Sequence, residues 1–231
     1  MRLHRFYINT PLEHTKTQVR DESLIHQWRN VFRYNVASEV ILFDGSGQEY
    51  DAVIEHLSNR EATVRLVRER KGVVPEKNIT LLISLIKKDK LEWIVEKATE
   101  LGVSKIVPII SERSEKKGFN IGRARKIMIE AAEQCGRADV PEIGQIMNLE
   151  ACIMNYAENA LVMDPSAAPV HNSHFITHNS LSIFVGPEGG WTEKEIERFK
   201  EAKMEIFSLG KLTLRTETAA IAALTVLGLL G

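Results

Sequence analysis

The chain has 231 residues, of which 44% are hydrophobic and 26% are charged, and its net charge is −1. This composition is that of an ordinary soluble protein with ample core, organised as one large domain or two small ones. The near-neutral charge means that any surface for a polyanion must be local, because the total charge does not favour one.

The cysteines and the apolar stretches indicate the cellular compartment of the protein. Cys135 and Cys152 are far apart and lack CxxC spacing, which is typical of a reducing compartment and gives no sign of a zinc site. No signal-peptide pattern is present at residues 1–10, and the uncharged tail 218–231 is too short to span a bilayer. We therefore expect a cytoplasmic protein that does not enter membranes.

The first 72 residues predict a small, mostly β domain that closes into a barrel or a sandwich. A hairpin-like turn at Asp44–Gly47 and a helical pattern at Glu22–Arg33 accompany its short β-type runs. The predicted strands are Arg5–Ile8, Glu39–Phe43, Glu49–Ile54 and Ala62–Val67. Residues 71–78 break this pattern and are the predicted linker.

Residues 73–231 instead alternate between strands and helices, which predicts a doubly wound α/β domain. Asp89 is the expected cap of a helix that runs to Leu101, with Gly102 at its C-terminal end. A second helix is predicted at Ile121–Cys135. The predicted strands are Ile79–Ile86, Lys105–Ile110 and Ala160–Met163.

Two glycine-bearing turns follow the last two predicted strands. The strand Leu181–Val185 leads into the turn Gly186–Gly190, and the strand Met204–Leu209 leads to Gly210. Between them, Thr192 and Glu195 have the spacing of a capping box for a helix over 191–203. A nearly all-apolar helix begins near Thr216 and includes Ala219–Leu230. Loops at neighbouring strand ends of such a sheet hold ligands, so these turns are the candidate site.

The chemistry of the turns supports a ligand. Three glycines within Gly186–Gly190 let the backbone approach a small molecule closely, and Glu188 places one carboxylate there. A tight turn with an exposed Glu188 is the alternative, but Arg215 and Glu217 directly before an apolar helix are hard to explain by packing. The chain has no P-loop, no GxGxxG motif after an early strand and no GxSxG elbow.

Two other clusters leave alternatives open. His171, His174 and His178 lie close together but are better explained by a surface loop than by a metal site, because a carboxylate or cysteine partner is missing. The basic segment 113–126 is either a solvated face or a surface for RNA phosphates. Cations and aromatics of the β domain, such as Arg5 and Arg33, fit RNA binding but are also common on inert surfaces.

Seven sequence blocks, in order along nearly the whole chain, resemble the RsmE family of ribosomal small-subunit RNA methyltransferases, part of the SPOUT superfamily. The two most specific are FVGPEGGWTEKE and LGKLTLRTETAA, and the others are HRFY, IHQWRNVFR, EKATELGV, SERS and EAAEQCGR. The resemblance implies a PUA-like RNA-binding β-barrel domain at residues 1–72. It also implies a SPOUT methyltransferase domain at residues 73–231 with a trefoil knot, which periodicity alone does not predict.

The resemblance further implies a homodimer that uses S-adenosylmethionine to methylate N3 of a uridine in 16S ribosomal RNA, within an assembled or assembling particle. Arg215 is then the expected catalytic residue, with Glu217 and Glu188 as possible proton acceptors. The segment Leu161–Asp164 is implied as a third wall and not as a direct ligand. The implied cofactor residues are Leu161, Phe184, Val185, Gly186, Pro187, Glu188, Gly189, Gly190, Leu209, Gly210, Leu214, Arg215, Thr216 and Thr218. The RNA-binding candidates are Arg5, Arg33, Arg113, Lys116, Lys117, Arg123, Gln134 and Arg137.

Two other functions compete with this one. A nucleotide hydrolase or kinase could use the same glycine turns, although the missing P-loop lysine counts against it. A non-catalytic RNA-binding assembly factor would bind RNA without taking up the cofactor.

Overall fold

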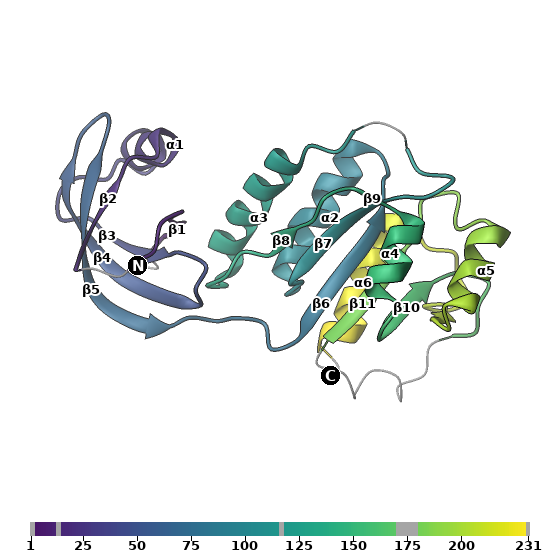
Figure 1. Ribbon diagram of the computed structural model, residues 1–231. Helices are drawn as coiled ribbons and strands as arrows, with labels where there is room; N and C mark the ends of the chain where they lie inside the picture. The colour runs from purple at the N-terminus through teal and green to yellow at the C-terminus, as the bar shows by residue number, and fades with distance from the viewer. Residues whose placement is uncertain (1–2, 13–14, 116–117, 170–179, 230–231) are drawn as a thin grey trace. The chain divides into compact units, whose positions relative to one another are not determined.

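The structure is a computed structural model that describes residues 3–12, 15–115, 118–169 and 180–229 (Figure 1). The chain divides into two compact units, each described by itself below. The N-terminal unit contains residues 1–74 together with 132–140, and the C-terminal unit contains residues 75–131 and 141–231. The predicted division at residues 72 and 73 stays a prediction.

A curled five-stranded sheet forms the N-terminal unit, with the strand order β1-β3-β4-β5-β2. Its strands are β1 (Arg5–Tyr7), β2 (Lys16–Val19), β3 (Glu39–Phe43), β4 (Gln48–Leu57) and β5 (Ala62–Lys71). β1 runs parallel to β3, and the other pairs are antiparallel. Among the described residues β1 and β2 are the edges of this sheet. The predicted barrel is therefore observed as a curled sheet, and β2 was missed.

The segment predicted as one helix over 22–33 contributes side chains to the core of this unit. Two elements are observed instead, α1 (Glu22–His26) and a π-helical turn, η1 (Gln27–Val31). Asp21 caps α1 by accepting from the backbone N–H of Ser23 and Leu24. Trp28, on η1, is fully buried and packs edge-on against Phe6. The wider π-helical turn thus accompanies the insertion of a large ring into the core.

The C-terminal unit is built on a seven-stranded sheet in which all observed pairs are parallel, so the predicted α/β class is confirmed. The strand order is β12-β10-β11-β6-β7-β8, with β9 also paired to β7. The strands are β6 (Asn78–Ser84), β7 (Lys105–Ile110), β8 (Glu142–Ile143), β9 (Met147–Asn148), β10 (Ala160–Met163), β11 (Ser180–Val185) and β12 (Glu205–Phe207). The central strands are almost continuously buried, as parallel strands covered on both faces are.

Helices cover both faces of this sheet (Figure 1). The helices are α2 (Lys88–Glu100), α3 (Ile121–Cys135), α4 (Leu149–Tyr156), α5 (Glu193–Glu201) and α6 (Thr216–Leu229). Cys152 of α4 and Phe199 of α5 share one core cluster with Val162 and Phe184 of the sheet. α2 contacts α6, and α6 also contacts β6 and β11. The apolar character of α6 is therefore explained at least in part by its own sheet and α2.

One local prediction is wrong, three short elements were not predicted, and one prediction is confirmed. Lys87, and not Asp89, occupies the N-cap position of α2, so Asp89 lies inside the first turn. α4 and the two-residue strands β8 and β9 were missed because they are too short to show a clear period. The capping box of Thr192 and Glu195 is confirmed at the start of α5. None of the helices in the described ranges is long and apolar enough to cross a membrane. The trefoil knot stays a prediction.

Candidate active site

A pocket of about 400 Å³ lies at the carboxyl ends of the three neighbouring parallel strands β12, β10 and β11. This is the edge at which open α/β sheets bind ligands, and the volume suits a small molecule. The pocket is lined by Met163, Asp164, Pro165, Val185, Gly186, Pro187, Glu188, Gly189, Gly190, Trp191, Phe207, Ser208, Leu209, Gly210, Leu212, Thr213, Leu214, Arg215, Thr216 and Ala219. Both glycine turns predicted from the sequence thus face one cavity.

The first loop, residues 186–190, needs its glycines for steric reasons. A Cβ on Gly186 would lie 3.1 Å from the indole ring of Trp191, which is closer than ordinary packing allows. Gly190 has a φ of +68°, a left-handed conformation that favours glycine. The Trp191 Nε1–H donates to the carbonyl oxygen of Met163 at 3.0 Å, which ties this loop to the end of β10. The loop is therefore packed tightly against Trp191, which a hydrogen bond anchors to the end of β10.

The turn after β7 braces the same loop from outside the pocket. Arg113 donates from Nη1 to the carbonyl oxygen of Gly189 at 2.6 Å. The backbone N–H of Glu112 donates to Glu195 Oε1 at 2.8 Å, and Thr192 Oγ1 donates to Glu112 Oε2 at 3.0 Å. The capping box of α5 and the SERS block are thus one hydrogen-bonded unit.

The second loop, residues 209–215, leads into α6. Gly210 has a φ of +135°, which is again a glycine conformation. The carbonyl oxygen of Arg215 accepts the first intrahelical hydrogen bond, from the backbone N–H of Ala219 at 2.8 Å. Arg215 is exposed and Thr216 is buried, and both line the pocket. Arg215 therefore lies at the exposed rim of the pocket.

Charged side chains from three elements meet beside the pocket. Lys90 Nζ, on α2, lies 2.9 Å from Glu188 Oε1 and 3.6 Å from Glu217 Oε1. The hydrogen bond with Glu188 raises the pKa of the Lys90 ammonium group above its ordinary value, although partial loss of water and the Arg215 charge act in the opposite direction. Sequence analysis missed Lys90, because a lysine in a helical first turn carries no signal by itself.

The structure brings together most of the predicted cofactor residues but not all of them. Leu161, Phe184 and Thr218 do not line the pocket in the described part of the chain. Leu161 and Phe184 are buried within their strands, and Thr218 is exposed. We therefore leave these three out of the site. Met163 and Asp164, at the end of the predicted third wall, do line the pocket, and Trp191 is a lining residue that was not predicted.

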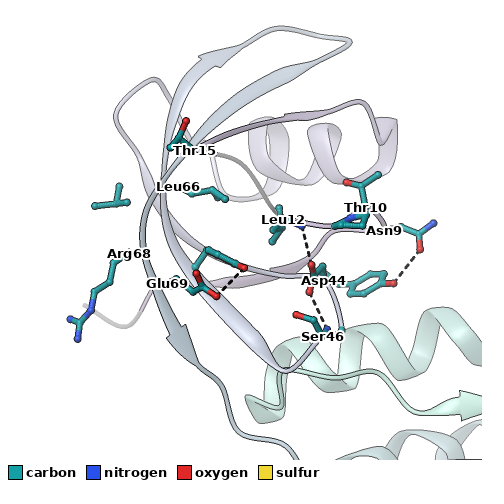
Figure 2. Close-up of a pocket in the computed structure, with 14 residues that line it drawn as sticks. Asn9, Thr10, Leu12, Thr15, Asp44, Ser46, Leu66, Arg68 and Glu69 are labelled. Carbon is teal, nitrogen blue, oxygen red and sulfur yellow. Dashed lines mark hydrogen bonds between the residues drawn. The ribbon is translucent and has the colours of Figure 1, made fainter.

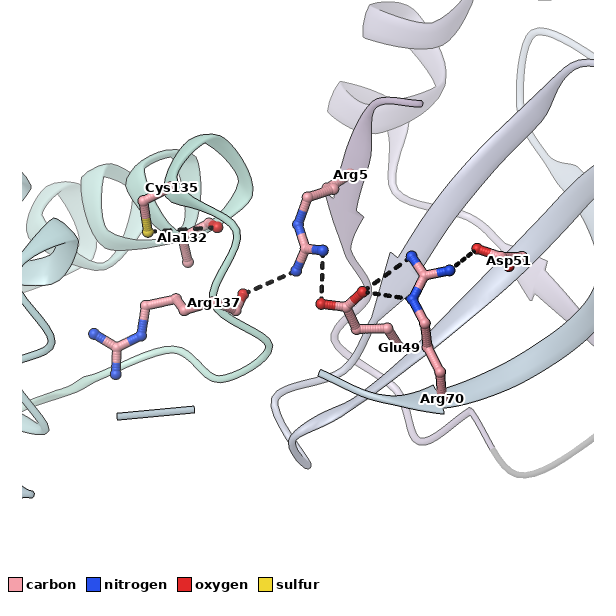
Figure 3. Close-up of polar contacts among 7 residues, drawn as sticks. All are labelled: Arg5, Glu49, Asp51, Arg70, Ala132, Cys135 and Arg137. Carbon is pink, nitrogen blue, oxygen red and sulfur yellow. Dashed lines mark hydrogen bonds and ion pairs between the residues drawn. The ribbon is translucent and has the colours of Figure 1, made fainter. Parts of the chain in front are cut away.

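Two of the predicted RNA-binding residues are buried inside the N-terminal unit (Figure 3). Arg5 is paired with Glu49 at 2.6 Å and donates to the carbonyl oxygen of Arg137. Arg137 is 4% exposed and its guanidinium group binds Asp139 at 2.7 Å. Buried and paired guanidinium groups have no free face for a phosphate, so we revise these two assignments to structural roles.

The other RNA candidates have different environments. Arg33, Arg123 and Gln134 are exposed, and Arg123 Nε lies 3.6 Å from Glu92 Oε2. Arg113 is exposed and donates to the carbonyl oxygen of Gly189. Lys116 and Lys117 lie outside the described residues, as do His171, His174 and His178. The assignment of Arg33, Arg123 and Gln134 to RNA stays a prediction.

A wider hollow of about 1050 Å³ lies on the N-terminal unit, beside Asn9, Asp44, Arg68 and Glu69 (Figure 2). Burial raises the pKa of the Asp44 carboxyl group, but hydrogen bonds from Ser46 and from the Leu12 N–H outweigh this and lower it overall. Asp44 is thus already engaged as an acceptor. The strand-end pocket, which both glycine loops line, therefore stays the candidate site.

Comparison with known proteins defines the class. The family described as "RNA methyltransferase domain" matches residues 74–228, and the family described as "RNA methyltransferase PUA domain" matches residues 29–67. The first match contains the whole strand-end pocket. The two units are therefore those of an RNA methyltransferase with a PUA domain.

Individual relatives narrow this class. Ribosomal RNA small subunit methyltransferase E of Rickettsia conorii is 33% identical over 100% of this chain and 97% of its own, and that of Bacillus subtilis is 32% identical over 96% and 95%. The crystal structure of the Neisseria gonorrhoeae enzyme of that name, bound to S-adenosylmethionine, has a TM-score of 0.89 at 31% identity and covers 99% of this chain and 98% of its own. A Legionella pneumophila methyltransferase with the same cofactor has a TM-score of 0.91 at 27% identity, covering 98% and 97%. This chain belongs to the ribosomal RNA small subunit methyltransferase E family, as its sequence blocks predicted.

Proposed function

We propose that this enzyme transfers a methyl group from S-adenosylmethionine to N3 of a uridine in 16S ribosomal RNA. The single observation that supports this most is the pocket at the ends of β10, β11 and β12, which both glycine loops line and at whose rim Arg215 lies. Its size and mixed apolar and backbone lining fit a nucleoside-sized cofactor. Two solved relatives carry that cofactor, which supports the same choice here.

The residues of the pocket fit the cofactor in two respects. The loops 186–190 and 209–215 line the pocket with backbone N–H and carbonyl groups. A ligand can approach this backbone closely at the glycines, because glycine has no side chain. Trp191 and Met163, at the end of β10, both line the pocket and are joined by a hydrogen bond. When bound, S-adenosylmethionine supplies an electrophilic methyl group on a sulfonium ion.

The chain itself must then manage the charge and the proton of the target base. The uridine imide has an in-plane lone pair at N3 only after it loses its proton, so the site must stabilise the anion or accept the proton. We assign the first role to Arg215, because its planar guanidinium group can stabilise negative charge on the flanking carbonyl oxygens. Glu217 and Glu188, both next to Lys90, are the candidates for the second role.

The wider context is also part of this proposal. We expect a homodimer in which each site lies near the interface, and a substrate that is an assembled or assembling ribosomal particle in the cytoplasm. Exposed cations such as Arg33 and Arg123 would contact the RNA backbone.

Deletion of the gene tests the function directly. Mass spectrometry of nuclease-digested 16S ribosomal RNA from the deletion strain should show the loss of one N3-methyluridine. The wild-type gene should restore it, and a gene carrying Arg215→Ala should not. Retention of all N3-methyluridine in the deletion strain would overturn the proposed substrate.

A further inference from the structure

Lys90 occupies a position that helix stability does not explain. It lies in the first turn of α2, close to the positive end of the helix dipole, where a cation is unfavourable. Its side chain is 26% exposed and is directed to two carboxylates from other parts of the chain. The placement is therefore best explained by those two contacts.

One carboxylate belongs to the first loop of the pocket, and the other belongs to the helix that follows the second loop. Glu188 lies in the first loop and lines the pocket, and Glu217 lies in the first turn of α6 directly after the second loop. The ammonium group of Lys90 is within 2.9 Å of one and 3.6 Å of the other. One cation thus connects both walls of the cavity.

The carboxylate of Glu217 is incompletely hydrogen-bonded among the described residues. Its Oε2 atom is buried and accepts no hydrogen bond from the residues that the structure describes. A buried carboxylate oxygen without a partner is unfavourable, so the nearby Lys90 charge is important for keeping this side chain where it is. The same first turn begins at Thr216, and Arg215 immediately precedes it. A change at Glu217 would therefore reach the residues at the pocket rim.

We propose that Lys90 is a positioning residue for methyl transfer, whose ammonium group holds Glu188 of the first loop and Glu217 of α6 together and so fixes the shape of the cofactor pocket. This inference rests on the proposed function, because it assigns Lys90 to the same site. Lys90 does not line the pocket, so it acts through the two carboxylates and not by touching the cofactor.

The test compares Lys90→Met and Lys90→Arg with a lysine of the same helix. Lys97→Met is the matched control, since Lys97 pairs only within α2, with Glu96 and Glu100, in the contacts observed among the described residues. Calorimetric titration with S-adenosylmethionine and the rate of methyl transfer to 30S particles are the two readouts. Loss of a partly exposed ion pair predicts up to about a fivefold rise in the cofactor Kd for Lys90→Met. Lys90→Arg should recover most of this loss because it keeps the charge, and Lys97→Met should match the wild type.

A double-mutant cycle tests whether Lys90 acts through the carboxylates. In a Glu188→Gln, Glu217→Gln background the Lys90→Met substitution should change the cofactor Kd by less than about twofold, because the partners are already neutral. Full additivity would overturn the inference. So would a Lys90→Arg variant as impaired as Lys90→Met, which would indicate a packing role for the lysine chain.

The failure of this inference is distinguishable from the failure of the proposed function. A wild-type protein that binds no S-adenosylmethionine would overturn the proposed function together with any role of Lys90 in it. A wild-type protein that binds and transfers normally, with Lys90→Met unchanged in both readouts, would overturn only the role of Lys90.

Discussion

Two arginines of the C-terminal unit have surroundings that differ from those of two arginines of the N-terminal unit. In the C-terminal unit Arg215 and Arg113 are exposed at the loops, one at the pocket rim and one bound to a loop carbonyl. In the N-terminal unit Arg5 and Arg137 are buried and paired with carboxylates. From the sequence, Arg5, Arg113 and Arg137 were all candidates for RNA binding, and Arg215 was the expected catalytic residue. The difference teaches that a cation is assigned to function by what surrounds it, and only secondarily by its neighbours in sequence.

The largest effect that separates the two kinds of arginine is expected at Arg215. Arg215→Ala should lower the rate of methyl transfer about 100- to 1000-fold, the loss typical of one electrostatic group at a reacting centre. The cofactor Kd should change by only about threefold, because the loops keep their backbone contacts. Rate and calorimetric measurements on one preparation check both. Arg198→Ala, on the exposed face of α5, is the control and should keep full activity. Equal activity of both variants would remove Arg215 from the mechanism.

Arg5 should matter for stability and not for chemistry. Its loss leaves Glu49, which is 4% exposed, with Arg70 as its remaining paired cation among the described residues. Arg5→Met should therefore lower the free energy of unfolding by roughly 3 kcal/mol, as breaking a buried ion pair does. Urea denaturation measures this, with Arg20→Met as the control, since Arg20 is exposed and its ion pair with Glu61 spans 3.7 Å. An Arg5→Met variant of normal stability that has lost RNA affinity would restore the original RNA-binding prediction.

A substitution at Gly186 tests whether cofactor binding requires the close packing of the first loop against Trp191. Gly186→Val should raise the cofactor Kd about tenfold or more, because even its Cβ would press on the Trp191 ring and the loop must shift. Gly122→Val is the control, since a Cβ there has only ordinary contacts. Calorimetry distinguishes the two variants. An unchanged Kd for Gly186→Val would mean that the cofactor does not touch this loop.

The smallest effects are expected for the exposed cations that we keep as RNA contacts. Arg33→Ala and Arg123→Ala should each weaken RNA binding a few-fold and lower the slope of log affinity against log salt by about one. Titrations of a 16S fragment at several salt concentrations measure this, and the cofactor Kd should stay constant. Lys200→Ala, exposed on α5, serves as the control. A slope that does not change would place the RNA surface elsewhere.

The sequence was most informative for features that depend on residues close together in the chain. Gly186 and Gly210 each follow a bounded apolar run, and such a pattern predicts both the strand and the loop after it. The capping box of Thr192 and Glu195 likewise involves residues only three apart. These features were predicted because they depend on neighbours in the chain.

Features that depend on distant partners were not predictable in the same way. The burial of Arg5 results from pairing with Glu49, and the role of Lys90 results from contacts with Glu188 and Glu217. Trp191 was assigned only to the start of a helix. In the structure it lines the pocket, and its indole N–H donates to the carbonyl oxygen of Met163. Such contacts arise only once the sheet is assembled.

A crystal structure of this protein grown with S-adenosylmethionine tests the central claim most directly. The account predicts that the cofactor lies at the carboxyl ends of β10, β11 and β12, between the loops 186–190 and 209–215, with Arg215 beside its methyl group. Electron density for the cofactor in another place, such as the hollow beside Asp44, would contradict it.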